Sequence, residues 1–141
     1  MLSRVLSIAF LVAACAGCST GLSDKNLVYI GVADAATLLT GPQGALDGSD
    51  GEIVVVDPRP SWSYRKGHIP KSINIPFGQL KIQLWKLEGA GVVIVTGETY
   101  NDSVALAMSK TLLNYGFKDV RTLRGGLTSW EDAGEPVLTT Q

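Results

Sequence analysis

Two runs of β-branched residues, 53–57 and 92–96, constrain the fold of this chain more than any other feature of its sequence. In both runs valine and isoleucine follow one another without the polar alternation of a strand that has one face in water. Each run therefore predicts a strand buried on both faces, as at the centre of a parallel sheet. Shorter segments at 28–30, 72–75 and 120–123 predict further strands.

Helical segments separate these predicted strands. They lie at 32–39, 60–66, 103–115 and 127–133, with a further amphipathic stretch at 77–87. Strands that alternate with helices at short intervals form parallel sheets with helices on both faces. We therefore expect an α/β fold, a three-layer sandwich with a central, mostly parallel five-stranded sheet flanked by helices.

Composition and charge narrow the class of protein. The 141 residues are 45% hydrophobic and 18% charged, which is typical of one globular domain. With 12 Lys and Arg against 13 Asp and Glu, the net charge is -1, so no nucleic-acid surface and no polybasic membrane patch are expected. The one histidine, His68, has no cysteine nearby, so neither a metal site nor another cofactor is expected.

The first residues have the pattern of a signal peptide. Arg4 supplies one positive charge, and residues 5–14 are then almost wholly apolar but too few to span a bilayer. Small residues precede both Cys15 and Cys18, an arrangement that resembles the lipobox of bacterial lipoproteins. The resemblance implies that one cysteine becomes the acylated, palmitate-carrying first residue of the mature protein.

Two cleavage positions remain open. Cleavage before Cys18 leaves no unpaired thiol in the mature chain, which suits an oxidising compartment, whereas Cys15 has the more usual branched residue three places upstream. Cleavage nearby by the ordinary secretory route is a further alternative. With Cys18 preferred, we expect a signal peptide at 1–17, a tether at 18–26 and one domain at 27–138. The lipid would hold this domain on the bacterial cell envelope, facing the periplasm or the cell exterior.

Two signatures in the predicted domain resemble those of the rhodanese homology domain. The first combines Asp-Pro-Arg at 57–59 with Gly-His-Ile-Pro and Ser-x-Asn-x-Pro at 67–76, and the second spans 116–137. The resemblance covers residues 27–137. It implies the α/β sandwich and, in active members, a cysteine after the central strand that carries a persulfide inside a ring of backbone N–H groups.

Several signature residues have structural roles under this resemblance. Asp57 and Arg59, at a strand end, are expected to form a charge-assisted pair that also fixes loop carbonyls. His68 is expected to act as a hydrogen-bonding pin for its turn, not as a catalytic base.

The second signature holds a glycine pair and an aromatic residue. Gly125 and Gly126 allow a tight turn beside the active-site loop, and Trp130 is expected to anchor the last helix in the core. Three further aromatic residues, Trp62, Phe77 and Trp85, are expected to pack in the core or at the rim, with a position lining the groove near the site as the alternative.

The loop that should carry the nucleophile contains no cysteine. One alignment places Tyr100 at the nucleophile, and another places Gly97 there with Asp102 where an arginine would stand. Neither a tyrosine nor a serine hydroxyl forms a persulfide, so no catalytic residue is predicted. Asp102 or Ser103 is expected to cap the following helix. The active-site loop comprises Gly97, Glu98, Thr99, Tyr100, Asn101, Asp102 and Ser103.

The charge of the loop also argues against sulfur transfer. The loop carries Glu98 and Asp102 without a lysine or arginine, so it should repel an anion such as thiosulfate, although Arg59, Arg65 and Arg124 are within possible reach of its mouth. We therefore expect a non-catalytic rhodanese-like module of an envelope lipoprotein that binds a ligand or a protein partner. The alternative is a sulfurtransferase or sulfur carrier that uses a partner's cysteine.

Overall fold

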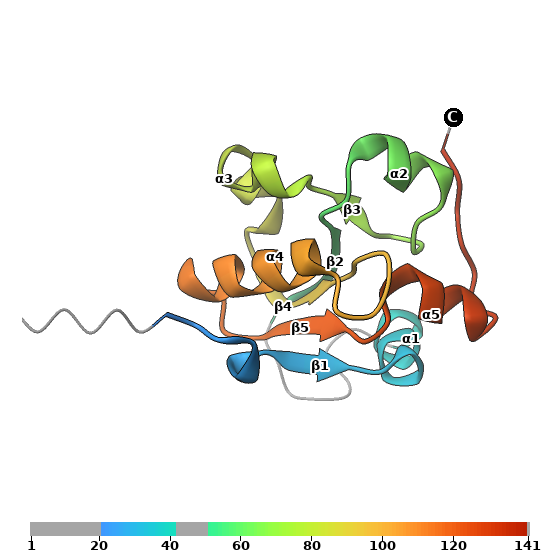
Figure 1. Ribbon diagram of the computed structural model, residues 1–141, viewed down its shortest axis with the longest axis horizontal. Coiled ribbons are helices and arrows are strands. Elements are labelled where there is room, and N and C mark those ends of the chain that lie inside the picture. The colour runs from blue at the N-terminus through green and yellow to red at the C-terminus, as the bar shows by residue number, and fades with distance from the viewer. Residues whose placement is uncertain (1–20, 42–50, 141) are drawn as a thin grey trace, which may run out of the picture.

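The computed structural model describes residues 21–41 and 51–140. Its sheet has five parallel strands in the order β1-β5-β4-β2-β3, with helices on both faces (Figure 1). The predicted three-layer α/β sandwich is therefore confirmed. The strands are β1 (Val28–Ile30), β2 (Glu52–Asp57), β3 (Ile73–Asn74), β4 (Ala90–Val95) and β5 (Val120–Leu123). The helical segments are η1 (Asp24–Asn26), α1 (Val32–Thr40), α2 (Ser61–Lys66), η2 (Phe77–Gln79), α3 (Leu80–Gln83), η3 (Leu84–Leu87), α4 (Ser103–Asn114) and α5 (Gly126–Asp132).

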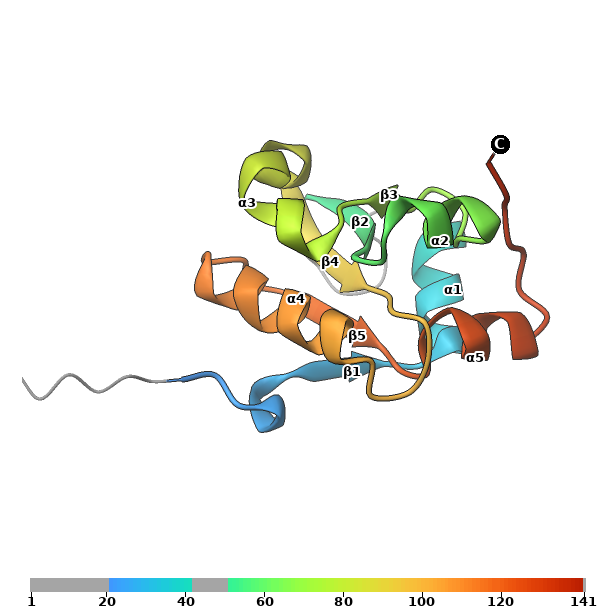
Figure 2. The same cartoon turned by 45° about the horizontal axis from the view of Figure 1, so that its top comes forward.

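The two β-branched runs form adjacent central strands, β2 and β4, and divide the core into two halves. Along β4, Val92 and Ile94 face the cluster that includes α1 and α5. Val93 and Val95 face the cluster that includes α3 and α4. Both faces of the strand are thus covered, which explains why the run lacks polar alternation. Figures 1 and 2 show α3 and α4 on one side of the sheet and α1 and α5 on the other.

The predicted amphipathic stretch 77–87 is not one helix. It divides into η2, α3 and η3, with Pro76 before the first turn. Leu80 and Leu87 are buried and hold the segment on the core, whereas Trp85 is 64% exposed. None of the three aromatic residues assigned to the core or the rim lies in the core, because Trp62 and Phe77 are also exposed.

Part of the predicted tether, residues 24–26, forms the short turn η1. Ser23 forms a capping box with Asn26, which closes η1, and Asp24 makes an ion pair of 2.8 Å with Lys110 of α4. The last residues of the predicted tether therefore have local structure and one contact with α4. The predicted signal peptide and both candidate lipidation sites, Cys15 and Cys18, lie outside the described residues. Across the described ranges, no helix has the length and apolar character needed to cross a membrane.

The sheet ends in short strands on both sides, with β1 of 3 residues at one edge and β3 of 2 residues at the other. The C-terminal segment runs back along α2 (Figure 1), where Leu138 forms an antiparallel bridge with His68. The Thr140 N–H also donates to the Arg65 carbonyl at 2.9 Å. Residues 138–140 are thereby tied to the last turn of α2 and to the turn that follows it.

Candidate functional site

The candidate site is the loop 97–102 that joins β4 to α4. The loop leaves the carboxyl end of a central parallel strand, which is where ligand sites of open α/β sheets lie. Figure 2 shows it passing between the start of α4 and the start of α5. The segment that the sequence predicted as the active-site loop therefore occupies the expected position in the fold.

The main chain of this loop is fixed against α5. Gly97 and Glu98 accept hydrogen bonds through their carbonyl groups from the N–H groups of Leu127 at 2.9 Å and Thr128 at 3.0 Å. The Thr128 hydroxyl donates a second bond of 2.9 Å to the Glu98 carbonyl. A Cβ atom on Gly126, whose φ is 58°, would lie 2.6 Å from the Gly97 oxygen. Glycine is required there because the two backbones touch.

Replacing Gly126 with alanine is expected to lower the free energy of unfolding by about 2–4 kcal/mol, because it adds a steric clash to a left-handed backbone. Gly134→Ala is the matched control. Gly134 has a φ of 76°, but a Cβ atom there would meet nothing within 4 Å. That change should cost only about 1 kcal/mol. Urea denaturation of both variants measures the difference, and equal losses would show that the contact with the loop is unimportant.

The interior of the loop is filled by a carboxylate of the chain itself. Asp102 accepts the Glu98 N–H at 2.8 Å through Oδ2. Its Oδ1 accepts the N–H groups of Val104 at 2.9 Å and Ala105 at 3.1 Å. Asp102 therefore caps α4, as one of the two expected capping residues, and closes the loop on itself. Ser103 is the first residue of α4 and does not make the cap.

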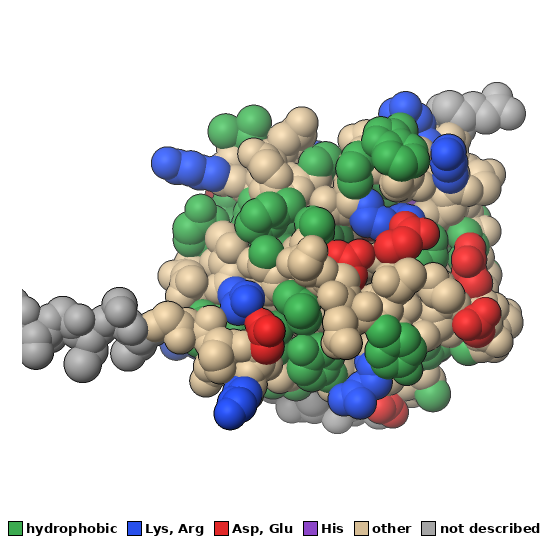
Figure 3. All heavy atoms as spheres, in the orientation of Figure 1, with side chains coloured by type: hydrophobic (Ala, Val, Ile, Leu, Met, Phe, Trp, Pro, Cys, Tyr) green, Lys and Arg blue, Asp and Glu red, His purple; other side chains and the backbone are tan. Residues whose placement is uncertain are grey.

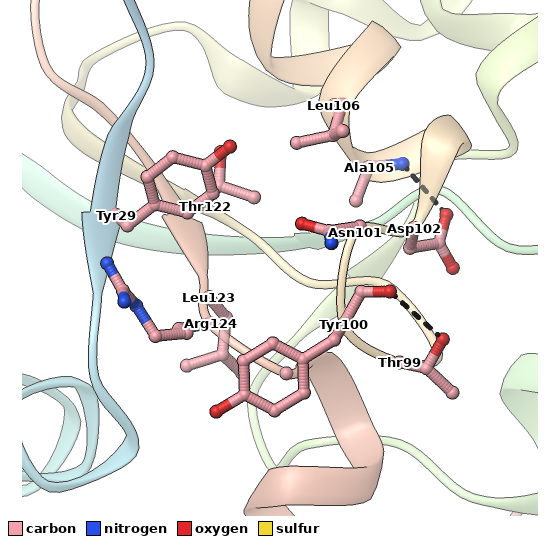
Figure 4. Close-up of a pocket in the computed structure, with 11 residues that line it drawn as sticks. Tyr29, Thr99, Tyr100, Asn101, Asp102, Ala105, Leu106, Thr122, Leu123 and Arg124 are labelled. Carbon is pink, nitrogen blue, oxygen red and sulfur yellow. Dashed lines mark hydrogen bonds between the residues drawn. The ribbon is translucent and has the colours of Figure 1, made fainter. Parts of the chain in front are cut away.

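The two candidate nucleophile positions lie in different surroundings. A Cβ atom on Gly97 would point into the loop, 2.7 Å from the Asp102 Cβ and Cγ and 2.9 Å from Oδ2. Tyr100 is 63% exposed, and its ring lies toward Leu123 and Arg124 while the Asp102 carboxylate points to the other side (Figure 4). Only position 97 thus faces the N–H groups that surround the carboxylate.

Beneath the loop lies a buried ion pair. The Arg59 guanidinium contacts Asp57, which is fully buried, at 2.7 Å and donates a further bond of 2.7 Å to the Gly67 carbonyl. It also reaches the Glu98 carboxylate, which is 55% exposed, at 2.6 Å. The expected pair and the expected carbonyl contact are both present, and Glu98 ties this network to the loop.

Two opposing effects set the pKa of Arg59. Burial alone would lower it, but the hydrogen bonds and charges of Asp57 and Glu98 outweigh burial and raise the pKa of Arg59 above its ordinary value. When the pKa of a basic group is higher in the folded protein than in the unfolded chain, its charge stabilises the fold. This stabilisation is complete at a pH below the pKa of the unfolded chain and is lost only as the pH rises through the pKa of the folded protein. The guanidinium is therefore charged at neutral pH and contributes no pH dependence there.

An open cleft of about 460 Å³ lies on one side of the loop, with Arg59 at its base and Glu98 and Glu131 among its lining residues. Trp62 forms part of its rim, where the Lys66 ammonium lies 4.9 Å from the centre of the indole ring. Figure 3 shows acidic side chains over the loop and α5, with basic side chains above them on α2. The mouth of the site therefore has mixed charge, with carboxylates nearest the loop.

A smaller cavity of about 270 Å³ lies on the other side of the loop, against the ends of β1 and β5 (Figure 4). Arg124 lines this cavity and not the cleft. Tyr29 and Thr122 complete the cavity from β1 and β5, and no sequence motif singled them out. Both residues come from short strands, and only the parallel pairing of β1 with β5 brings them to the loop.

His68 and Trp130 hold the surrounding structure and do not face the loop interior. The His68 Nδ1 lies 2.9 Å from the Tyr64 carbonyl, so it carries the proton, and its ring stacks on the Tyr64 ring at 3.9 Å. Trp130 is buried and donates from Nε1 to the Pro136 carbonyl at 2.9 Å. Within the residues that the structure describes, no cluster of three or more His, Cys, Asp or Glu residues is arranged to hold a metal ion.

The parallel sheet, the paired Asp57 and Arg59 and the loop that opens onto α4 define an α/β domain of the rhodanese type. The chain belongs to the rhodanese-like domain family, which it matches over residues 44–133.

Individual relatives have different functions. The sequence is 31% identical over 123 residues to the HTH-type transcriptional regulator Rv0324 of Mycobacterium tuberculosis, a match that covers 82% of this chain but 54% of the regulator. It is 29% identical over 82 residues to the thiosulfate sulfurtransferase GlpE of Pseudoalteromonas translucida, covering 58% of this chain and 76% of the relative. The BH2092 protein of Bacillus halodurans has the same fold, with a TM-score of 0.66 at 24% identity over 82% of this chain and 80% of that protein.

Proposed function

We propose that this protein is a non-catalytic rhodanese-like module that binds a ligand or a protein partner at the cell envelope. One observation carries the proposal. The N–H groups of Glu98 in the loop and of Val104 and Ala105 at the start of α4, which would hold a charged sulfur atom in an active member of the family, are bonded to the carboxylate of Asp102. The loop thus contains its own anion in place of a reactive one.

The side chains of the loop support this proposal. A persulfide requires a thiol, and residues 97–103 contain none. Among the described residues no hydrogen bond joins the Ser103 hydroxyl to His68, whose ring is bonded to and stacked on Tyr64 instead. Glu98 and Asp102 place negative charge where thiosulfate, a dianion, would have to approach.

The alternative function is that of a sulfurtransferase, because one relative is named a thiosulfate sulfurtransferase. A cysteine supplied by a partner would have to enter the loop and displace Asp102, whose carboxylate accepts three hydrogen bonds there. The pattern at Cys15 and Cys18 supports the envelope location, with a lipid on Cys18 as the preferred form.

A sulfurtransferase assay tests the proposal directly. We expect the full-length protein to produce thiocyanate from thiosulfate and cyanide no faster than the Tyr100→Ala variant or a reaction without protein. The Tyr100→Ala variant lacks the one loop side chain that an alignment places at the nucleophile. Thiocyanate production well above that of the Tyr100→Ala variant would refute the proposed absence of catalysis.

A further inference from the structure

The cavity beside the loop has the features of a built ligand site, and it is separate from the cleft over Arg59. Its volume of about 270 Å³ is small for a ligand pocket, so it suits a ligand of one ring and a few further atoms. We propose that it binds a small planar aromatic carboxylate. The inference rests on the proposed function, because it names the ligand of the binding module.

The charged group of the site is Arg124. Its guanidinium lies 5.4 Å from the centre of the Tyr29 ring, and within the described residues no carboxylate or carbonyl accepts a hydrogen bond from it. Arg59 and Arg121, by contrast, are each paired with an aspartate. A planar guanidinium matches a carboxylate with two parallel hydrogen bonds, so Arg124 is available for one anionic group.

The walls of the cavity suit an aromatic ring. Tyr29 and Tyr100 contribute two partly exposed phenol rings from opposite sides, while Leu106 and Leu123 supply apolar surface (Figure 4). Aromatic rings prefer offset or edge-on contacts with other rings, and two tyrosines allow both. Gly125 allows this arrangement, because a Cβ atom there would lie 2.8 Å from Cε2 of Tyr100.

Polar groups of the loop orient the ligand without cancelling the charge of Arg124. Asn101, whose φ is 54°, directs its side-chain amide into the cavity (Figure 4). Asp102 also lines the cavity, but its carboxylate points toward the start of α4 and accepts three backbone hydrogen bonds. The net effect is one unpaired positive charge beside a neutral amide and two rings, which favours a monoanion over a dianion.

Binding is tested with benzoate and the full-length protein by NMR titration of the backbone amides. We expect saturable shifts at Asn101, Arg124 and Gly125, with a dissociation constant on the order of 1 mM, as is usual for a single-ring ligand. Benzamide, the neutral analogue, should bind about tenfold or more weakly, because it lacks the charge that Arg124 recognises.

Matched variants make the result specific to this cavity. Arg124→Gln should weaken benzoate binding about tenfold or more, whereas Arg65→Gln, on α2, should leave it unchanged. Tyr100→Leu should also weaken binding, and Tyr115→Leu, an exposed tyrosine outside the cavity, should not. Equal affinity for benzamide, unchanged affinity in Arg124→Gln, or shifts without saturation would each overturn the assignment. Because the titration uses neither thiosulfate nor cyanide, sulfurtransferase activity would refute the proposed function without affecting this result.

Discussion

Replacing Gly97 with cysteine and Asp102 with glycine together is expected to give a loop that accepts sulfur from thiosulfate, whereas Gly97→Cys alone is expected to remain inactive. Position 97 faces the ring of N–H groups, but a side chain there would lie 2.7 Å from the Asp102 Cβ. Only glycine at 102 removes that Cβ together with the carboxylate. Glycine is also tolerated at the position that caps a helix.

The size of the effect follows from charge as well as space. Two unit charges about 4 Å apart near a protein surface interact by roughly 4 kcal/mol, so a carboxylate beside the new thiolate strongly opposes both its ionisation and the approach of thiosulfate. Removing Asp102 should therefore raise the rate of sulfur uptake by at least about 100-fold over Gly97→Cys alone. The freed N–H groups of Glu98, Val104 and Ala105 would then face the anion.

The measurement is the intact mass after incubation with thiosulfate, in a background where Cys15 and Cys18 are serine. The thiolate attacks the outer sulfur of thiosulfate, the S–S bond breaks with its electron pair leaving on sulfite, and one sulfur atom stays on the cysteine. Cyanide then removes that sulfur as thiocyanate and restores the thiolate. Tyr100→Cys with Asp102→Gly is the control and should gain no stable sulfur, because Tyr100 lies outside the ring. Equal sulfur uptake at positions 97 and 100 would contradict this geometry.

Replacing Arg59 with alanine is expected to lower the free energy of unfolding by about 3–5 kcal/mol, which is a large part of the stability of a small domain. After this change, the fully buried Asp57 carboxylate would keep only the main-chain N–H of residue 59 as a partner. The Gly67 carbonyl would lose its donor. Denaturation by urea at neutral pH measures the loss. Removing one member of a buried pair costs far more than removing an exposed one.

Two variants separate the buried half of this network from its exposed half. Glu98→Gln removes the more exposed charge and should cost at most about 1 kcal/mol. Arg59→Lys keeps a positive charge but loses the planar guanidinium group. Its loss of unfolding free energy should lie between those of Arg59→Ala and Glu98→Gln. A loss of less than about 1 kcal/mol for Arg59→Ala would show that the pair does not support the loop, and the lysine variant gives the answer if the alanine variant does not fold.

Local sequence was sufficient to predict most of the fold. Valine and isoleucine at 92–95 predicted a strand covered on both faces, and both faces are indeed covered. Long-range contacts, by contrast, could not be predicted from local sequence. Within the predicted tether, Asp24 gains its partner, Lys110, only from α4, 86 positions further along the chain.

The candidate site was predictable in its place but not in its detail. The missing cysteine is visible in the sequence, and the acidic residue before Ser103 indicated a helix cap. The two alignments of the loop differ by three positions, however, and only the direction of each side chain distinguishes them. The cavity was not predictable, because Tyr29 on the edge strand becomes its neighbour only through parallel pairing with β5.

The short outer strands of the sheet bear on how the protein behaves when many copies are crowded together. An exposed strand edge is a template onto which another chain can add, and long, flat edges lead to fibrous aggregates. With 3 residues in β1 and 2 in β3, each border offers few free N–H and C=O groups to a neighbour. The short borders of this sheet should therefore resist edge-to-edge polymerisation even when molecules are packed densely.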